Sequence, residues 1–151
     1  MLISVIVIII LLCDILTKKW AAFYLKSVND IPVIPNILHL TYVENTGAAW
    51  GMMKNMRWTF VGITVIVVLL IIVFLYKTRP QNLWLKIGAT FVLGGALGNL
   101  IDRAFLGYVV DFINVAAINF PVFNIADVFV CLGAVMVGIY YCFFDKKETG
   151  Q

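Results

Sequence analysis

The sequence predicts an all-α integral membrane protein of four transmembrane helices, with a small β-containing loop domain at one membrane face. Hydrophobic residues make up 63% of the 151 residues and charged residues only 13%, whereas a soluble domain would carry about 25% charge. Four apolar runs of roughly 20 residues are each long enough to cross a bilayer as a helix. They are about twice the length of a barrel strand, which excludes the other spanning architecture.

The four predicted spans form one membrane-embedded domain, residues 1–151, without a repeat or a linker. The first span begins at the N-terminus, where it could be mistaken for a signal peptide. No basic region precedes it and no small-residue cleavage site follows, and Leu12 stands before Cys13 where a lipoprotein signal would need a small residue. We therefore expect it to be a retained helix. The predicted spans are about 2–23, 58–76, 83–101 and 125–144.

The loop between the first two spans, residues 24–57, is too long to be a simple connector. Residues 37–43 have β character, and residues 44–47, Glu-Asn-Thr-Gly, have the composition of a turn. Residues 52–58 mix apolar, basic and aromatic side chains, as interfacial segments do. A small sheet lying at the membrane surface would fit these features.

An even number of spans places both termini and the polar turn 77–82 at one membrane face. The loops 24–57 and 102–123 must then share the other face. This threading brings most of the polar groups that lie within or beside the spans to the same leaflet. Basic residues number five on the terminal side and six on the other, so the positive-inside rule does not decide the orientation. The converging residues are Asp14, Asn99, Asp102, Arg103, Asp111 and Asp127.

Asp111 and Asp127 are the candidate catalytic pair, each embedded in apolar neighbours. Carboxylates are costly near lipid, so acidic residues there indicate function. Two carboxyl groups at short range separate into one acid and one base, which could activate a water molecule. Asn124 is placed to cap the last span with Asp127 at its N3 position, where the helix dipole favours an ionised carboxylate. Ion or proton translocation and purely structural polar contacts remain open from the pattern alone, as does an assembly factor without chemistry.

Other polar residues in the spans have structural interpretations. Asp14 and Lys18 are spaced for an i,i+4 ion pair, which either neutralises two buried charges or supports the site. The glycines of LGGALGN (94, 95 and 98) form a small-residue face for close helix packing. Arg103 follows Asn99 on one helix face and could neutralise a nearby carboxylate or bind a lipid phosphate. Asp102 is interpreted as a charge at the membrane boundary.

Several functional classes do not fit the sequence. The only histidine, His39, lies in the alternating segment, and neither a GxSxG elbow nor an HExxH motif is present. Three cysteines without a CxxC spacing indicate neither a disulfide framework nor a zinc site. We expect no metal and no cofactor. The net charge of +3 is too small and too scattered for nucleic-acid binding. The three cysteines are Cys13, Cys131 and Cys142.

Five blocks in order resemble the bacterial lipoprotein signal peptidases, the signal peptidase II family, along nearly the whole chain. Together they are highly specific. The chief departure is Glu44, where the family pattern favours a basic or polar neutral residue. The blocks are DILTK at 14–18, YVENTGAAWG at 42–51, GGALGNLIDR at 94–103, VVDF at 109–112 and FPVFNIAD at 120–127.

The resemblance implies an aspartyl endopeptidase of the bacterial inner membrane. It implies that both termini are cytoplasmic, that loop 24–57 is extracytoplasmic, and that the active site lies toward the outer leaflet. The implied substrate is a prolipoprotein, cut just before a cysteine that carries diacylglyceryl, and the implied inhibitor is the cyclic peptide globomycin. We expect a monomer in contact with membrane lipids. Asp111 and Asp127 match the catalytic dyad, and the implied supporting or substrate-binding residues are Asp14, Lys18, Asn45, Gly47, Gly95, Asn99, Arg103, Asn124 and Ala126.

Overall fold

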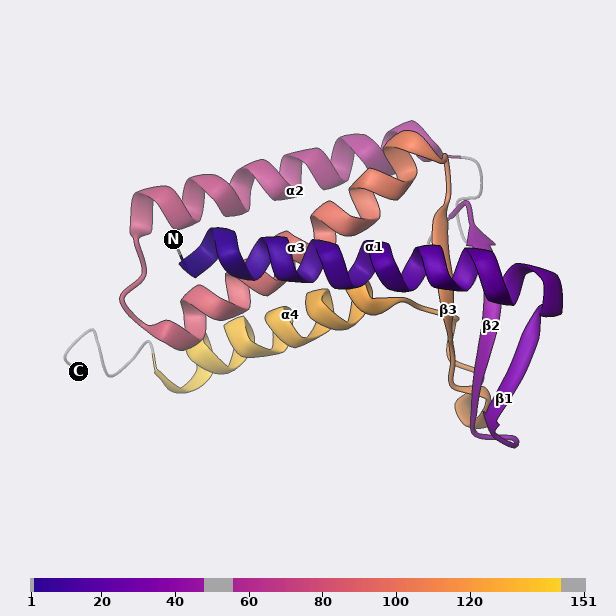
Figure 1. Ribbon diagram of the computed structural model, residues 1–151. Coiled ribbons are helices and arrows are strands. Elements are labelled where there is room, and N and C mark those ends of the chain that lie inside the picture. The colour runs from indigo at the N-terminus through magenta and orange to yellow at the C-terminus, as the bar shows by residue number, and fades with distance from the viewer. Residues whose placement is uncertain (1, 48–55, 145–151) are drawn as a thin grey trace.

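The computed structural model describes residues 2–47 and 56–144, which form four long helices and a three-stranded antiparallel sheet (Figure 1). The helices lie side by side, and the sheet stands across one end of the bundle. The elements are α1 (Leu2–Val28), β1 (Asp30–Ile34), β2 (Leu38–Asn45), α2 (Arg57–Thr78), α3 (Leu83–Phe105), β3 (Val109–Asn114), the 3-10 turn η2 (Ala116–Ile118) and α4 (Ile125–Phe143).

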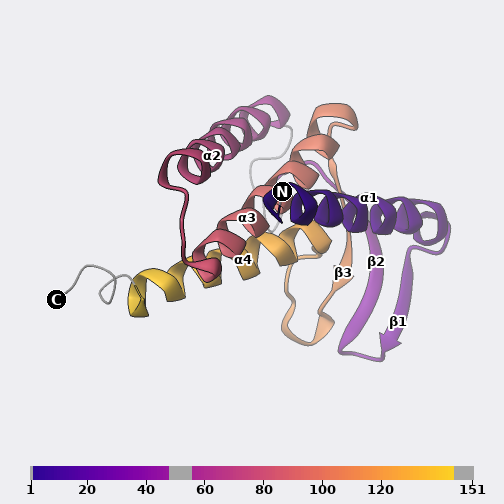
Figure 2. The same cartoon turned by 60° about the vertical axis from the view of Figure 1, so that its left-hand side comes forward.

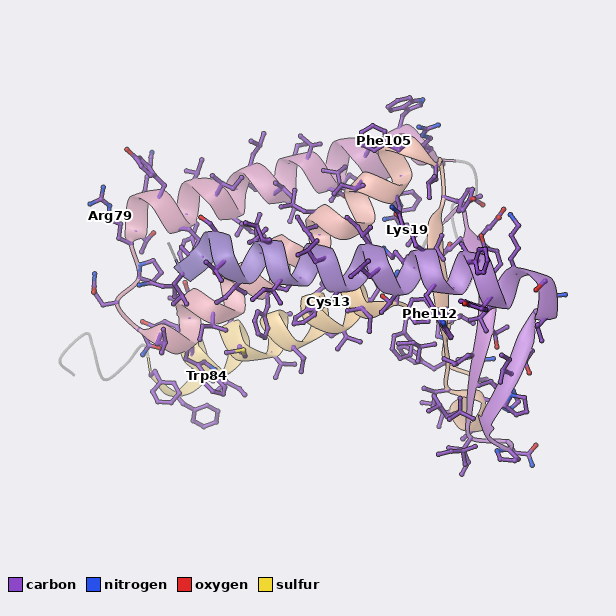
Figure 3. The ribbon with its side chains drawn as sticks, in the orientation of Figure 1. Cys13, Lys19, Arg79, Trp84, Phe105 and Phe112 are labelled. Atoms are coloured by element: carbon purple, nitrogen blue, oxygen red, sulfur yellow. The ribbon has the colours of Figure 1, made fainter. Side chains whose placement is uncertain are left out.

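Three of the helices, α2, α3 and α4, are long and apolar enough to cross a membrane. Helix α1 is longer still, at 27 residues, and the charges near its middle, Asp14 and Lys18, are buried inside the bundle. Large apolar side chains cover the outer surface instead, as expected for helices that face lipid. Trp84 and Phe105 project outward from opposite ends of α3 (Figure 3), where aromatic residues are typical of the membrane interface.

Helix α3 is the centre of the bundle, and the other three helices pack on it. It begins at Asn82, whose side-chain oxygen accepts hydrogen bonds from the backbone N–H groups of Trp84 and Leu85. Its glycines confirm the predicted packing face. A Cβ atom at Gly94 would touch Ile10 of α1, and one at Gly95 would collide with the Ala126 carbonyl of α4. The absence of side chains here lets three helices meet closely.

The sheet has the strand order β1-β2-β3, and both pairs are antiparallel. It is fixed to the bundle by a small core of Ala21 and Leu25 from α1 with Val110 and Phe112 from β3. Figure 2 shows the strands beside the second half of α1, near the end of α3 and the start of α4. The sheet therefore lies where the predicted polar residues converge.

Three local predictions need correction. The strand predicted over 37–43 is present, but it continues through Asn45, so the predicted turn 44–47 is shortened to its last two residues. Residues 109–114, expected to be loop, form the third strand. Helices α1 and α3 also extend beyond the predicted spans, to Val28 and Phe105. Most of the predicted interfacial segment 52–58 lies outside the described residues, and Arg57 and Trp58 already belong to α2.

Candidate active site

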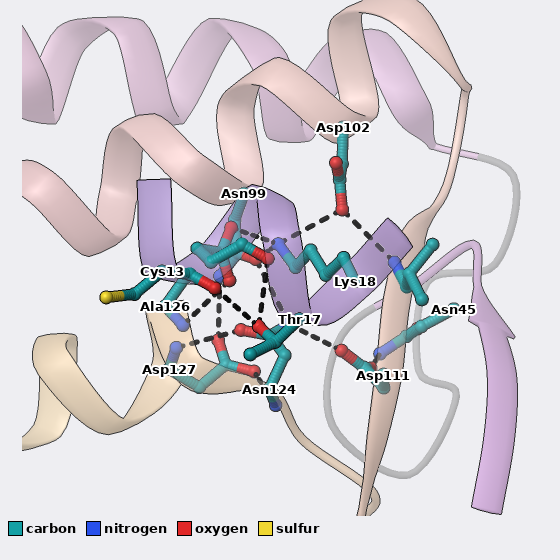
Figure 4. A network of polar contacts seen from close by, with 12 residues as sticks. Cys13, Thr17, Lys18, Asn45, Asn99, Asp102, Asp111, Asn124, Ala126 and Asp127 are labelled. Atoms are coloured by element: carbon teal, nitrogen blue, oxygen red, sulfur yellow. Dashed lines mark hydrogen bonds and ion pairs between the residues drawn. The ribbon is translucent and has the colours of Figure 1, made fainter. Parts of the chain in front are cut away.

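Asp111 and Asp127 line the same cavity, of about 460 Å³, between the sheet and the bundle. Asp111 comes from the middle of β3 and Asp127 from the first turn of α4. Figure 4 shows the two side chains within one continuous network of polar contacts. The cavity is lined by Asn45, Gly47, Asn99, Arg103, Val109, Asp111, residues 120–123, Asp127, Val128, Cys131 and Leu132.

Strand pairing positions Asp111. It lies opposite Val43 in β2, and the next two backbone N–H groups, of Phe112 and Ile113, both donate to the carbonyl of Phe123. These bonds join β3 to the segment that leads into α4. Because Asn124 and α4 follow Phe123 directly, the strand that carries Asp111 and the helix that carries Asp127 are held together.

A capping box positions Asp127. The Asn124 side-chain oxygen accepts from the Asp127 N–H at 3.0 Å, and Asp127 Oδ2 accepts from the Asn124 N–H at 3.2 Å. The other carboxylate oxygen, Oδ1, accepts from Asn99 Nδ2 at 2.7 Å. The predicted N-cap is therefore confirmed, and it orients Asp127 at the start of the helix.

Asn45 and Asn124 hold Asp111 from both sides. Asn45 Nδ2 donates to Asp111 Oδ2 at 2.8 Å, and Asn124 Nδ2 donates to Oδ1 at 2.6 Å. The orientation of each amide is fixed, because the Asn45 oxygen accepts from the Gly47 N–H and the Asn124 oxygen accepts from the Asp127 N–H. Each amide therefore presents its NH2 group, and not its oxygen, to Asp111. Asn124 also donates to Asn99 Oδ1 at 3.2 Å, and Asn99 donates to Asp127, so two amides in series connect the two carboxylates.

Burial raises the pKa of the Asp111 carboxyl to about 7. The amide donors of Asn45 and Asn124 oppose this effect, and the nearby charge of Asp127 adds to it. Asp111 is only 2% exposed, so the cost of removing a charge from water dominates. At neutral pH the group is therefore divided between its protonated and ionised forms, as general acid–base catalysis requires.

A buried ion cluster lies next to the two candidate aspartates. Lys18 Nζ contacts Asp14 Oδ2 at 2.7 Å, Asp102 Oδ2 at 3.0 Å and Asn99 Oδ1 at 3.0 Å. The Asp14–Lys18 pair predicted from the sequence is thus confirmed. Asp102, predicted as a charge at the membrane boundary, lies in the last turn of α3, where it is buried and paired with Lys18, which removes the cost of an unpaired charge.

The two carboxylates of this cluster, Asp14 and Asp102, also accept hydrogen bonds from the backbone next to Asp127 and Asp111. Asp14 Oδ1 accepts from the Ala126 N–H at 3.0 Å, and Asp102 Oδ2 accepts from the Val110 N–H at 3.2 Å. Ala126 and Val110 each immediately precede one of the two candidate catalytic aspartates. The ion cluster therefore fixes the backbone at both positions.

Arg103 lines the cavity from α3 without a direct carboxylate partner among the residues that the structure describes. One guanidinium nitrogen donates to the Gly47 carbonyl at 3.3 Å, and the group lies over the ring of Phe60 at 5.1 Å. Its predicted neutralising contact with a carboxylate is therefore not formed within ion-pair distance. Gly98, like Gly95, has no room for a side chain, since a Cβ there would meet the Asp14 carboxylate and Ala126.

Some cavity residues were not predicted. Residues 120–123 form an apolar wall before α4, and Cys131 and Leu132 continue it one turn beyond Asp127. The i,i+4 spacing of Cys131 from Asp127 is the sequence signal that places both on one face. Cys131, like Cys13 and Cys142, is a free and exposed thiol.

Neither His39 nor Glu44 lines the cavity. His39 pairs with Asp30 at 2.9 Å in the hairpin, outside the cavity. Glu44, the departure from the family pattern, accepts hydrogen bonds from Lys26 at 2.8 Å and Tyr42 at 3.0 Å and does not line the cavity. In the described part of the chain, no three histidine, cysteine or acidic side chains are grouped as metal ligands would be.

Comparison with known proteins identifies close relatives. A family model described as signal peptidase (SPase) II matches residues 6–144. The lipoprotein signal peptidase of Clostridioides difficile is 46% identical over 98% of this chain and 99% of its own length, and that of Clostridium acetobutylicum is 43% identical over 93% and 94%. A bacterial membrane enzyme solved by the in meso method at 2.3 Å resolution superposes with a TM-score of 0.87 at 32% identity, covering 99% of this chain and 91% of that one.

Proposed function

The chain belongs to the signal peptidase II family of aspartic peptidases, and we propose that Asp111 and Asp127 form its catalytic dyad. As a member of that family it is a multi-pass bacterial membrane peptidase that removes signal peptides from prolipoproteins. One observation carries the proposal for the dyad: both carboxylates line one cavity, and the buried side chain of Asn124 contacts both residues, donating to the Asp111 carboxylate and accepting from the backbone N–H of Asp127.

In the proposed reaction, Asp127 accepts a proton from a water molecule while protonated Asp111 donates a hydrogen bond to the scissile carbonyl. The attack forms a tetrahedral centre, and the proton held by the dyad is then passed to the leaving amine. The raised pKa of Asp111 suits it to the acid role.

The surrounding residues act by position. Asn45, Asn99 and Asn124 orient the carboxylates, and Asp14, Lys18 and Ala126 hold the backbone before Asp127. Gly95 allows α4 to approach α3. Gly47 and Arg103, which contact one another at the rim of the cavity, are placed to bind the substrate backbone. Trp50, which belongs to the matching block 42–51, lies outside the described residues.

The proposed substrate is a prolipoprotein whose conserved cysteine carries diacylglyceryl, cut immediately before that cysteine. The apolar wall formed by residues 120–123, Cys131 and Leu132 suits acyl chains that reach the cavity from the lipid. Contacts made far from the scissile bond would then position it. The same cavity is the expected binding site of globomycin.

We further place the protein in the cytoplasmic membrane as a single-domain monomer, with both termini cytoplasmic and the cavity toward the outer leaflet. The even number of long helices and the position of the sheet at the end of the bundle opposite the N-terminus support this threading.

The substrate proposal is tested with purified protein and two matched peptides, one carrying diacylglyceryl on the cysteine and one with the free thiol. We expect cleavage before the cysteine of the lipidated peptide only, and inhibition by globomycin. Equal cleavage of both peptides would contradict the role of the lipid. No cleavage of either, with ion flux in vesicles instead, would favour a membrane carrier that uses the same carboxylates.

A further inference from the structure

A second cavity, of about 570 Å³, opens in the half of the bundle remote from the sheet. Its wall is almost wholly apolar and is built from three helices. Helices α2 and α4 each pack on α3, but they do not pack against one another along their length, so α3 forms the floor between them. The lining residues are Leu70, Ile71 and Phe74 of α2, Leu85, Ala89 and Val92 of α3, and Ala134, Val137, Gly138 and Tyr141 of α4.

This cavity continues the face of the two helices that already line the active site. On α4, Asp127 and Cys131 of the first cavity are followed by Ala134, Gly138 and Tyr141 of the second. These spacings of three and four residues follow one face of an α-helix. On α3 the same face runs from Leu85, Ala89 and Val92 to Asn99 and Arg103. The two cavities therefore lie in succession along one face of α3 and α4, with the dyad at one end, and we call this face the groove.

From this continuity we propose that the groove between α2 and α4 binds the apolar segment of the substrate's signal peptide as a helix. The inference rests on the proposed function and adds where the part of the substrate before the scissile bond lies. In lipid, that segment must satisfy its own backbone hydrogen bonds, so it enters as a helix. A groove lined by three helices has a shape that suits a fourth helix.

The length of the groove agrees with this occupant. From Asp127 to Tyr141 the α4 face spans 14 positions, which is about 21 Å at 1.5 Å per residue. The apolar region of a signal peptide has roughly 7–15 residues, which as a helix is about 10–22 Å long. A segment of that size would fill the groove while its C-terminal end reached the dyad.

The wall also carries an unused packing motif. Ala134 and Gly138 form a small-xxx-small pair of the kind that lets membrane helices approach closely, and no atom lies within 4 Å of a Cβ built at Gly138. Gly133, one position earlier, is by contrast packed against Gly88 and Val92 of α3. The Ala134–Gly138 pair therefore faces the groove, where the substrate helix would lie.

The test is Gly138→Phe, which places a large side chain in the groove without disturbing a packed contact. Gly62→Phe is the matched control, because Gly62 also has nothing within 4 Å of an added Cβ and lines neither cavity. Each variant is assayed on a full diacylglyceryl-modified prolipoprotein and on a lipidated peptide truncated to remove the apolar segment. Thermal unfolding in detergent confirms that both variants fold.

We expect Gly138→Phe to raise KM for the full substrate at least tenfold and to leave the truncated peptide unaffected. Unchanged cleavage of the full substrate would overturn the proposal. An equal loss on both substrates would also overturn it, because the groove would then hold the acyl chains. The dyad would survive either result, whereas failure of the wild-type protein to cleave any lipidated substrate would remove the proposed function itself.

A second measurement does not depend on turnover of the truncated peptide. A benzophenone amino acid at position 138 of the non-cleaving Asp127→Asn variant is irradiated with full substrate bound. Cross-links to the apolar segment of the signal peptide are expected, with none from position 62. Cross-links to lipid or to the substrate's acyl chains alone would contradict the assignment.

Discussion

Three asparagine side chains, Asn45, Asn99 and Asn124, donate hydrogen bonds to the two carboxylates of the site. Because these amides are neutral donors, they orient the two carboxylates without placing a full positive charge next to them. Neither cation nearby forms an ion pair with the two carboxylates in the described residues: Lys18 reaches Asp127 through Asn99, and Arg103 donates to the Gly47 carbonyl. This arrangement leaves one carboxyl able to carry a proton near neutral pH.

The pH dependence of cleavage tests this arrangement. Activity that needs protonated Asp111 is present below its pKa of about 7 and is lost as the pH rises through that value. Asn45→Ala removes a donor that favours the ionised form, so the pKa of Asp111 should rise further. A hydrogen bond to a charged group is worth about 1.5–3 kcal/mol, and one pKa unit corresponds to about 1.4 kcal/mol. We therefore expect the alkaline limb of kcat/KM to move up by about one to two pH units.

The control is Asn114→Ala, which removes a contact to Thr41 in the same sheet without touching either carboxylate. Its pH profile should match that of the wild-type protein. If the alkaline limb of Asn45→Ala stays in place while the rate falls, Asn45 contacts substrate and does not tune Asp111.

At the scale of the elements, the site depends on how closely α4 approaches α3. Gly95 faces the Ala126 carbonyl and Val130, and Ala126 immediately precedes Asp127. Gly95→Ala should force the two helices apart at this point, and over-packing of this kind costs about 1–3 kcal/mol. We predict a lower unfolding temperature together with a lower kcat, measured on the same detergent-solubilised preparation.

Gly62→Ala provides the comparison, because its added methyl group meets open space. It should be neutral or slightly stabilising, since alanine favours the helix by up to about 1 kcal/mol over glycine. A Gly95→Ala protein with wild-type stability and activity would show that the close approach is not needed.

At the scale of the whole molecule, the sequence could predict the features that depend on neighbouring residues or on the length of a span. The apolar runs and their even number placed the polar residues at one face, and the Asn-x-x-Asp pattern gave the cap of α4. Strand β3 was missed because residues 109–114 are few and depend on pairing with β2, far away in the sequence. The ion pair of Asp102 was not predicted for the same reason, since its partner Lys18 lies on another helix.

The position of the dyad depends on all of these parts together. Asp111 and Asp127 reach one cavity only because the ion cluster joins α1 to α3 and to the backbone before each aspartate. The pattern of the sequence could suggest that the two carboxyls meet, but the contacts of Lys18 with Asp102 and of Asp14 with Ala126 join residues distant in the chain. The proposed dyad is therefore one unit and not two independent residues.

The most direct test compares single-turnover cleavage of a lipidated substrate by Asp111→Asn, Asp127→Asn and the double variant. Groups that act as one unit give strongly non-additive losses. We predict that each single variant loses at least a thousandfold in rate, remains folded, and is no faster than the double variant. Turnover retained by either single variant, or a double loss equal to the product of the single losses, would contradict the dyad.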